Sequence, residues 1–500
     1  MNKKSLFKSI TICIMMILTL STMISCKKKV TPPTNEIVDQ LTIYSINDFH
    51  GAIKERASRV AGYIERNSKD KEDETLVLSA GDMFQGSGIS NLNYGLDMIN
   101  IMNMIGFDAM ALGNHEFDWE LGTVLRYFDG DSTNGEADFP LLCANVVENE
   151  TNELPENVDE YAIIEQGGLK IGIIGFIAYG IESSIATAMV EDYTILQPFD
   201  IISNCAYELR TKHDVDIVIA NGHDSSSTLN QNLANLSGDR QIDAIINGHS
   251  HGTYANNLIR NTDKKVVPCV QAGSSGSNVG IINLTIDEKT KTVSNASCRN
   301  QKITDVSSED TKVKKYVDEL VSTTADVFER VIGTAGKEID RYEGARWAAN
   351  ALQEYAEREY SDCDVAFINI GGIRSDAFPI VENEAVTVNK LFEIMPFDNA
   401  LKITTLKGSV IENLIIYGGS GSELVYSQNT VYVEGNEVYI NQVILDDDLE
   451  YRVATIDYVF DKPEYPFLNG RNTIITGILF RDIMIENIEK LTQNNQKWYA

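Results

Sequence analysis

One pattern constrains the fold more than any other: from residue 41 to about 305 the chain repeats a single unit. Each unit has a short apolar run, then a turn of Gly, Asn, Asp and His, then a more polar or helix-prone stretch. This alternation predicts a layered α/β domain. The runs are almost continuously apolar, which indicates strands buried on both faces. We expect strands at 41–46, 75–79, 109–112, 170–176, 216–220 and 242–246.

The length of 500 residues predicts more than one domain, because single hydrophobic cores seldom grow beyond about 250 to 300 residues. We place the first domain at 41–305 and a smaller second domain at 331–500. A charged, helix-prone stretch at 306–330 has no strand-like run and is expected to link them. The second domain is expected to have strands at 365–369, 401–404, 431–433 and 452–455, and helices at 345–359 and 407–417.

The N-terminus has the features of an export signal. Lys3, Lys4 and Lys8 precede an apolar run at 10–20, which is too short to span a bilayer comfortably. The stretch that ends at Cys26 resembles a bacterial lipobox. We therefore expect a lipoprotein signal peptide at 1–26, lipidation of Cys26 and a polar tether at 27–40. The predicted location is outside the cytoplasm, at the cell surface or in the periplasm, with a lipid anchor in the membrane.

The net charge of −31 excludes DNA or RNA as a large partner, since such a surface repels polyanions. A small anionic substrate remains compatible, because bound metal ions reverse the local field. We expect a monomer. The cysteines beyond Cys26 form no Cys-x-x-Cys pair, so neither a disulfide framework nor a thiolate metal site is indicated. A single disulfide between Cys269 and Cys298 stays open as an alternative.

Five of the six histidines directly follow predicted strands, together with carboxylate and amide side chains. The carboxyl ends of parallel strands meet at one sheet edge, so these groups are expected to converge. Carboxylate, amide and imidazole ligands without sulfur suit Zn²⁺, Mn²⁺, Co²⁺ or Fe²⁺. About seven such groups fit two divalent ions with a shared carboxylate better than one ion. The alternative is that these residues only cap turns. The candidate ligands are Asp48, His50, Asp82, Asn114, His223, His249 and His251.

The sequences around these residues are Asn-Asp-Phe-His-Gly at 47–51, Leu-Ser-Ala-Gly-Asp at 78–82, Gly-Asn-His-Glu-Phe-Asp at 113–118 and Gly-His-Ser-His at 248–251. In this order they resemble the calcineurin-like metallophosphoesterase superfamily, and their longer forms resemble its 5′-nucleotidase family. The resemblance implies a four-layered α/β metallophosphoesterase domain and a smaller α/β C-terminal domain that binds substrate.

The same resemblance implies a role for each group. One metal would be held by Asp48, His50 and His251, the other by Asn114, His223 and His249, with Asp82 as the bridge. His115 and Asp118 would form a catalytic pair, and Asn114 would take part in catalysis as well as in metal binding. Nucleotidases of the family often have Gln where His251 stands, which bears on metal preference.

In the second domain, Asn-Ile-Gly-Gly-Ile-Arg at 369–374 resembles the family's substrate motif, which implies substrate contacts for Asn369, Gly371, Gly372 and Arg374. Phe397 resembles an aromatic that stacks on a nucleobase. For the second aromatic, Tyr458 aligns best and Phe460 is the second choice. The family's Gly-Gly-Asp-Gly segment is absent. An additional phosphate-binding arginine is either Arg341 or Arg346.

The resulting hypothesis is a phosphoesterase that cleaves 5′-nucleotides to nucleosides and phosphate with metal-activated water. Alternatives within enzymes are a 2′,3′-cyclic nucleotide phosphodiesterase, a UDP-sugar hydrolase or a hydrolase of related esters, including thiosulfate-type conjugates. A surface nucleotide-binding protein without catalysis is the alternative from another class. Such a protein would be expected to have lost metal ligands, whereas here every position is filled.

Overall fold

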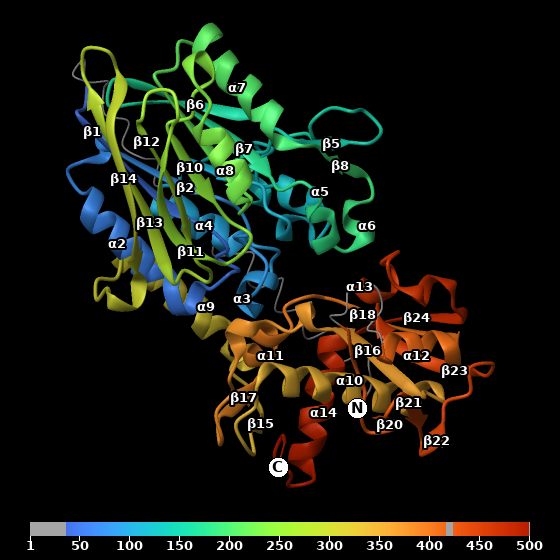
Figure 1. The fold of residues 1–500 in the computed structure, drawn as a ribbon. Coiled ribbons are helices and arrows are strands. Elements are labelled where there is room, and N and C mark those ends of the chain that lie inside the picture. Colours follow the sequence, from blue (N-terminus) through green and yellow to red (C-terminus); the bar gives the residue numbers. More distant parts are fainter. Residues whose placement is uncertain (1–36, 417–423, 500) are drawn as a thin grey trace. The chain divides into compact units, whose positions relative to one another are not determined.

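The computed structural model describes residues 37–416 and 424–499 (Figure 1). The predicted signal peptide, Cys26 and most of the predicted tether lie outside the described residues. Among the residues that are described, no helix combines the length and apolar character needed to cross a membrane.

The N-terminal domain contains two six-stranded mixed sheets. The first has the order β14-β13-β1-β2-β3-β4, in which β1 to β4 are parallel and β13 and β14 are antiparallel additions. Its strands are β1 (Gln40–Ile46), β2 (Thr75–Ser79), β3 (Ala109–Ala111), β4 (Leu141–Leu142), β13 (Asn278–Asp287) and β14 (Thr292–Lys302).

The second sheet has the order β11-β12-β10-β9-β7-β6, with four parallel strands between antiparallel edge strands β6 and β11. Its strands are β6 (Tyr161–Gln166), β7 (Leu169–Ile177), β9 (Ile217–His223), β10 (Ala244–Asn247), β11 (Thr253–Ile259) and β12 (Val266–Ala272). A short pair, β5 (Val146–Glu148) and β8 (Tyr193–Ile195), lies apart from both sheets.

Alternation along the strands explains the burial of both faces. On β9, Ile217 and Ile219 belong to the apolar cluster between the two sheets, whereas Val218 and Ala220 belong to the cluster under the outer helices. On β1, Ile43 faces the other sheet and Tyr44 faces the helices. Each strand thus needs apolar residues at successive positions, which is why the runs have no polar alternation.

Helices cover the outer face of each sheet (Figure 1). Beside the first sheet are α2 (Ser58–Ser68), α3 (Gly88–Asn91), α4 (Leu96–Ile105) and α9 (Thr311–Phe328). Beside the second are α7 (Pro198–Lys212) and α8 (Ser227–Ala234). Two single-turn helices, α5 (Leu121–Leu125) and α6 (Thr187–Val190), belong to loops. The order helix, sheet, sheet, helix confirms the predicted four-layered α/β class.

The C-terminal domain has a five-stranded sheet of order β19-β16-β23-β18-β24. Its strands are β16 (Val365–Asn369), β18 (Ala400–Lys407), β19 (Leu424–Tyr426), β23 (Glu450–Ile456) and β24 (Arg471–Leu479). Smaller sheets are formed by β15 (Val331–Thr334) with β17 (Ala385–Thr387), and by β20 (Val431–Glu434), β21 (Glu437–Ile440) and β22 (Val443–Ile444). The helices are α10 (Arg341–Tyr360), α11 (Val388–Ile394), α12 (Gly408–Ile416), α13 (Asp457–Phe460) and α14 (Phe480–Gln493).

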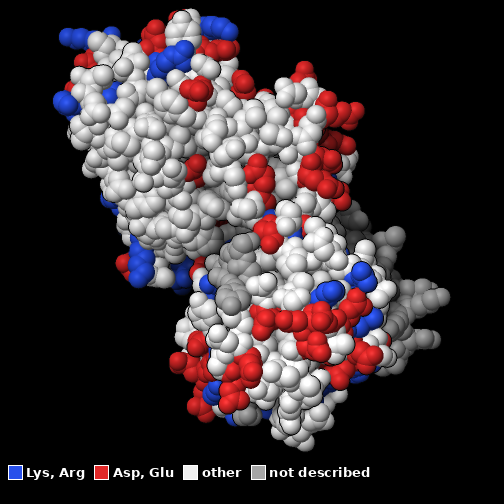
Figure 2. Space-filling view, turned by 45° about the vertical axis from the view of Figure 1, so that its right-hand side comes forward, with Lys and Arg blue, Asp and Glu red and all other residues white. Residues whose placement is uncertain are grey.

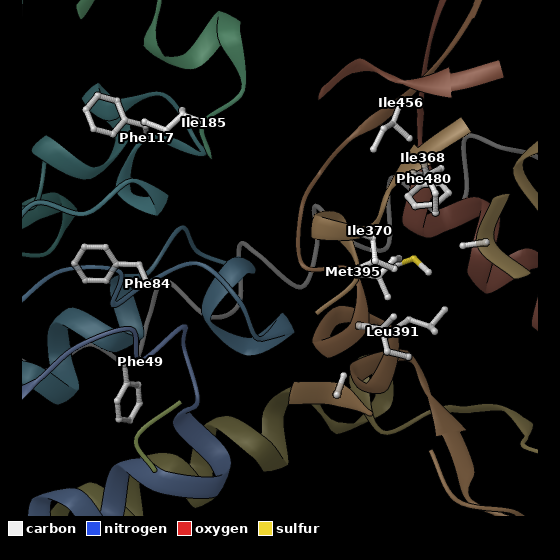
Figure 3. Packing of buried hydrophobic residues seen from close by; sticks show 14 of the residues in the cluster. Phe49, Phe84, Phe117, Ile185, Ile368, Ile370, Leu391, Met395, Ile456 and Phe480 are labelled. Carbon is white, nitrogen blue, oxygen red and sulfur yellow. The ribbon is translucent and has the colours of Figure 1, made fainter. Parts of the chain in front are cut away.

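Buried apolar side chains from several of these elements form the core of this domain. Figure 3 shows Ile368 from β16, Leu391 from α11 and Phe480 from α14 among them, with Ile370 and Met395 from the adjoining loops. Since Ile370 lies within the predicted substrate segment at 369–374 and Met395 lies two residues before Phe397, the core anchors the loops that carry the predicted substrate residues.

The strands predicted at 75–79 and 365–369 coincide with β2 and β16, and every predicted strand overlaps an observed one. The other described strands were missed, among them the largely buried β12 and β13 and the antiparallel β11 and β14, whose exposed faces carry Asn, Ser and Thr instead of apolar residues. His223 ends β9 and does not follow it.

Two further expectations concern sulfur and charge. All five described cysteines are free thiols, so the alternative disulfide between Cys269 and Cys298 is wrong. The Cys298 thiol instead lies 3.7 Å from the backbone carbonyl of Cys269. Figure 2 shows Asp and Glu side chains in several groups on the viewed face, in keeping with the acidic composition.

Candidate metal centre and substrate cleft

The candidate ligands all lie at the carboxyl ends of parallel strands. Asp48 and His50 follow β1, Asp82 follows β2 and Asn114 follows β3. From the second sheet, His223 ends β9, while His249 and His251 follow β10. Carboxylate and imidazole atoms from these loops come within 4.8 Å of one another in three overlapping groups that could hold metal ions. The convergence expected from the strand pattern is therefore present.

Five of these residues have a left-handed backbone conformation, with φ of 50° at Asp48, 51° at His50, 56° at Asp82, 77° at His249 and 57° at His251. This region is uncommon for residues other than glycine. Backbone strain of this kind collects at functional sites, where the surrounding structure holds it in place. These left-handed turns thus direct the five side chains from the strand ends of both sheets toward one point.

The first half of the cluster joins Asp48, His50 and His251. The Nε2 atoms of the two histidines are 3.0 Å apart, and Nε2 of His251 is 3.5 Å from Oδ1 of Asp48. Two imidazole nitrogens that face each other beside a carboxylate oxygen can present lone pairs to a common point. This set fits one divalent ion of the kind that imidazole and carboxylate groups prefer.

The second half joins Asn114, His223 and His249. Nε2 of His223 and Nδ1 of His249 are each 3.1 Å from Oδ1 of Asn114. Oδ2 of Asp82 is 3.1 Å from Nε2 of His223. Asp82 also belongs to groups with Asp48 and with His50, so it lies next to both halves. A shared carboxylate in this position fits a site for two ions.

The outer nitrogens of two histidines are held by backbone carbonyls. Nδ1 of His50 is 3.1 Å from the carbonyl oxygen of Gln85, and Nδ1 of His223 is 2.7 Å from that of Ala80. Such contacts fix the ring orientation and leave the other nitrogen to face a metal. The ligand atoms fit metal ions, and so do the hydrogen bonds that hold the rings of His50 and His223 in place.

Burial sets the protonation of the cluster. It lowers the pKa of His249 and of His251 to about 4, and lowers the pKa of His50 well below its usual range. These rings are thus neutral, the form that binds metals. Burial also opposes charge on His223, but the Asp82 carboxylate raises the pKa of that ring to about 10. A divalent ion beside Asp82 would take the place of this proton.

His115 lies at the edge of the cluster toward the C-terminal domain. Its Nδ1 is 2.8 Å from Oδ2 of Asp118, and its Nε2 is 3.2 Å from Nη2 of Arg374. Burial lowers the pKa of His115, but Asp118 and Asp82 together raise it above the ordinary value. The carboxylate of Asp118 thereby orients the ring and favours its charged form.

Glu116 is a structural residue that the sequence analysis missed. Its fully buried carboxyl accepts hydrogen bonds from the backbone amides of Asp82, Met83 and Gly113, at 2.9, 2.9 and 2.8 Å. It therefore ties the loop after β2 to the loop after β3. A Cβ on Gly113 would lie 2.3 Å from Oδ1 of Asp82, so only glycine fits there. The signal was available, because both residues lie inside the Gly-Asn-His-Glu motif.

A cleft of about 1140 Å³ runs along the cluster and is lined by both domains. All the predicted substrate residues line it: Asn369, Gly371, Gly372, Arg374, Phe397 and Tyr458. The cluster contributes Asp82, Asn114, His115, His249 and His251 to the opposite side. The candidate metal ligands and the predicted substrate motif therefore share one cavity, although they are far apart in the sequence.

The alternatives that the sequence left open differ in position. Tyr458 lines the cleft, whereas Phe460 is buried, is not a lining residue and has the Lys402 ammonium 4.8 Å from the centroid of its ring. Arg341 also lines the cleft and donates to the carbonyls of Ile373 and Ile370, while Arg346 is not among the lining residues. Tyr458 and Arg341 are thus the two positions that a ligand could reach.

Phe397 packs against His115 in the cleft. Its ring stacks on the ring of His115, with centroids 5.4 Å apart and planes at 28°, and the Arg374 guanidinium lies 5.0 Å from its centroid. An aromatic face, an arginine and a histidine therefore lie together beside the metal groups. This combination suits a phosphate joined to a planar group.

Two family models match the chain: calcineurin-like phosphoesterase over residues 41–253, and 5′-nucleotidase, C-terminal domain, over residues 322–469. The chain therefore combines a calcineurin-like phosphoesterase domain with a 5′-nucleotidase C-terminal domain. The order of the two matches along the chain agrees with the two domains of the fold and with the residues that line the cleft.

Relatives of the family support this assignment. A snake venom 5′-nucleotidase of Crotalus adamanteus is 26% identical over 73% of this chain, and a cell wall protein of Listeria monocytogenes is 25% identical over 83%. The chain spans 64% and 60% of their respective lengths. The crystal structure of a 5′-nucleotidase precursor from Thermus thermophilus has the same fold, with a TM-score of 0.72 at 23% identity, over 90% of this chain and 96% of that one.

Proposed function

We propose that this protein is a metal-dependent phosphoesterase that hydrolyses 5′-nucleotides to nucleosides and phosphate. The observation that carries the proposal is the position of the substrate motif: Arg374 and Phe397 contact His115, which borders the group of candidate metal ligands. A nucleotide in this cleft would have its phosphate between the cluster and Arg374. Its base would lie toward Phe397 and Tyr458.

Two divalent ions, of Zn²⁺, Mn²⁺, Co²⁺ or Fe²⁺, would be held by the seven candidate ligands, with Asp82 between them. Such ions supply Lewis-acid stabilisation and lower the pKa of a bound water. The chain's own groups would do the rest. His115, oriented by Asp118, would stabilise charge on the transferring phosphoryl group or protonate the leaving oxygen. Arg374 would bind the phosphate oxygens as a charged donor.

The proposal assigns different tasks to the two domains. Residues 41–305 would carry the reaction and residues 331–500 would recognise the substrate, with the stretch at 306–330, which contains α9, as the link. In the C-terminal domain, Asn369 at the end of β16 and Gly371 and Gly372 in the turn that follows would contact the substrate. Arg341 is the proposed additional phosphate-binding arginine, because it lines the cleft beside that loop.

The test is hydrolysis of a substrate panel by purified protein loaded with defined metals. The panel holds nucleoside mono-, di- and triphosphates, 2′,3′-cyclic nucleotides, UDP-glucose and a thiosulfate conjugate. We expect the highest kcat/KM with 5′-monophosphates and no turnover after chelation. Preference for cyclic nucleotides, UDP-glucose or the sulfur ester would reassign the substrate. Tight nucleotide binding without any turnover would identify a non-catalytic binding protein.

We also propose that the protein acts outside the cytoplasm, as a monomer anchored through a lipid on Cys26. The basis is the lipobox-like sequence, together with the similarity to a cell wall protein of Listeria monocytogenes. Cys26→Ser should abolish incorporation of labelled fatty acid and shift the protein from the membrane fraction. The wild-type chain is the control, and unchanged labelling of the variant would exclude the lipobox.

A further inference from the structure

A buried carboxamide without a partner lies in the wall of the cleft. Gln85 stands three residues after Asp82 in the loop that follows β2, and it is 1% exposed. Within the described part of the chain, neither its Oε1 nor its Nε2 atom makes a hydrogen bond. Burying an amide without a partner is unfavourable, and native proteins leave few such groups. The position of Gln85 therefore indicates a ligand that completes its hydrogen bonds.

The loop holds this side chain where a substrate would pass. Gln85 lines the same cleft as Asp82, His115 and Arg374. Its backbone carbonyl is 3.1 Å from Nδ1 of His50, so the residue is tied to the metal group through its main chain. The next residue, Gly86, has φ of 157°, and a Cβ there would lie 2.1 Å from the carbonyl oxygen of His50. This close approach keeps the loop against His50.

Gln85 lies on the side of the cleft that the N-terminal domain forms, and this position determines which part of a substrate it would contact. Phe397 and Tyr458, the proposed contacts of the base, belong to the other domain. Gln85 lies with His50, whose ring centroid is 5.2 Å from that of His115. The portion of the ligand on this side is the portion common to every phosphoester, the phosphoryl group.

We infer that Gln85 is a substrate-contact residue whose Nε2 donates a hydrogen bond to an oxygen of the phosphoryl group. The inference rests on the proposed function and adds a residue to it. A carboxamide suits the task, since it donates to the anion without adding charge beside the metal groups and Arg374. Its Oε1 atom would accept from water or from a hydroxyl group of the substrate.

Two variants separate the hydrogen bond from the fold. Gln85→Leu removes both polar atoms at similar size, and Gln85→Glu keeps the shape but replaces the donor with an anionic oxygen. For Gln85→Leu we expect KM to rise about tenfold or more, equally for AMP and for 4-nitrophenyl phosphate. Gln85→Glu should lose more, because its carboxylate repels the phosphate. Metal content should stay unchanged in both.

Binding of inorganic phosphate, measured by calorimetry on metal-loaded protein, tests the inference without turnover. We expect both variants to bind phosphate at least tenfold more weakly than wild type. Gln353→Leu is the matched control, because that buried amide is fully hydrogen-bonded to Cys363, Asp364 and Thr430 and is not a lining residue of the cleft. It should lower stability and leave phosphate binding intact.

Each outcome decides one question. Unchanged phosphate binding and KM in both Gln85 variants would overturn the inference, while hydrolysis by the wild type would keep the proposed function. Loss of metal from Gln85→Leu would also overturn it, by making Gln85 a positioning residue for His50. If the wild type hydrolysed neither substrate, the proposed function would fail, and phosphate binding would still test Gln85.

Discussion

The two walls of the cleft are built in different ways. On the N-terminal wall, the candidate metal ligands stand at the ends of hydrogen-bonded strands and contact one another at 3.0 to 3.5 Å. On the C-terminal wall, the predicted substrate residues stand mostly on loops, Gly371 is exposed and Oδ1 of Asn369 has no partner among the described residues. Groups on rigid strand ends hold a fixed geometry, whereas loops tolerate change. We therefore expect the candidate metal site to be rigid and the predicted substrate surface beside it to be more adaptable in conformation.

The largest effect should come from the centre of the rigid wall. Asp82→Ala removes the carboxylate next to both halves of the cluster, so we expect loss of both metals and of measurable turnover. The loss of metal affinity should exceed the roughly 10- to 100-fold change that follows removal of an outer partner of a metal site. Metal content by mass spectrometry and hydrolysis of AMP provide the measurements.

The matched control for that experiment is Asp243→Ala. Asp243 is also buried, but it directly precedes β10, pairs with Arg210 at 2.6 Å and is not a lining residue of the cleft. It should lower thermal stability while metal content stays intact. Two bound ions and normal turnover in Asp82→Ala would contradict the bridging position.

A smaller effect is expected at the boundary between the walls. His115→Ala should lower kcat by about 10²- to 10³-fold, because the ring acts on the transferring group more than on the resting metals. Asp118→Asn should give a smaller loss in the same direction, since the amide still contacts Nδ1. Stopped assays over a range of AMP concentrations give kcat and KM separately.

His213→Ala serves as the control for His115, because His213 is partly exposed and packs on Tyr161, away from the cleft lining. It should leave kcat unchanged. Loss of metal from His115→Ala would show that His115 is a ligand, in keeping with its place in a group with His50 and Asp82. In that event the set of metal ligands on the N-terminal wall would include His115 and extend further toward the C-terminal domain.

The same contrast explains what could be predicted from the sequence. The strand ends were predictable, because parallel buried strands are apolar at every position and their polar ends stand out. Many other strands were not predicted; β11 and β14, for example, have one polar face that makes them resemble loops in the sequence. The individual distances of the cluster were also beyond prediction, because they depend on the left-handed turns at residues such as His249 and on the hydrogen bonds of Glu116. Stacking of Phe397 on His115 joins residues 282 positions apart and has no local signal.

The third prediction concerns the C-terminal wall and tests it by substitution of Phe397. Stacking on a base is worth about 1 to 3 kcal/mol in single-strand binders, so Phe397→Ala should raise KM for AMP about tenfold or more. A generic aryl phosphate needs less from this wall and should change much less. Phe397→Leu, which keeps apolar bulk beside His115, is the companion variant. Equal losses for both substrates in Phe397→Ala would mean that the ring supports His115 and does not hold a base.

The smallest effect should follow removal of one hydroxyl from the same wall. The Tyr458 hydroxyl donates to the carbonyl of Ser183 at 3.0 Å, and the same carbonyl accepts from the Lys462 ammonium at 2.8 Å. Tyr458→Phe keeps the ring that lines the cleft, and Ser183 keeps its other donor. We therefore expect KM for AMP to change by about twofold or less and stability to fall by about 1 kcal/mol or less.

Tyr458→Ala should raise KM further, because it removes the stacking surface. Since the family's Gly-Gly-Asp-Gly segment is absent, both variants should affect purine and pyrimidine monophosphates alike. If Tyr458→Phe lost as much as Phe397→Ala, and more for one base than another, the hydroxyl would be a substrate contact. Substrate specificity on the C-terminal wall would then depend on a directional hydrogen bond from Tyr458. The two walls would in that case differ less in how strictly they fix the positions of their functional groups.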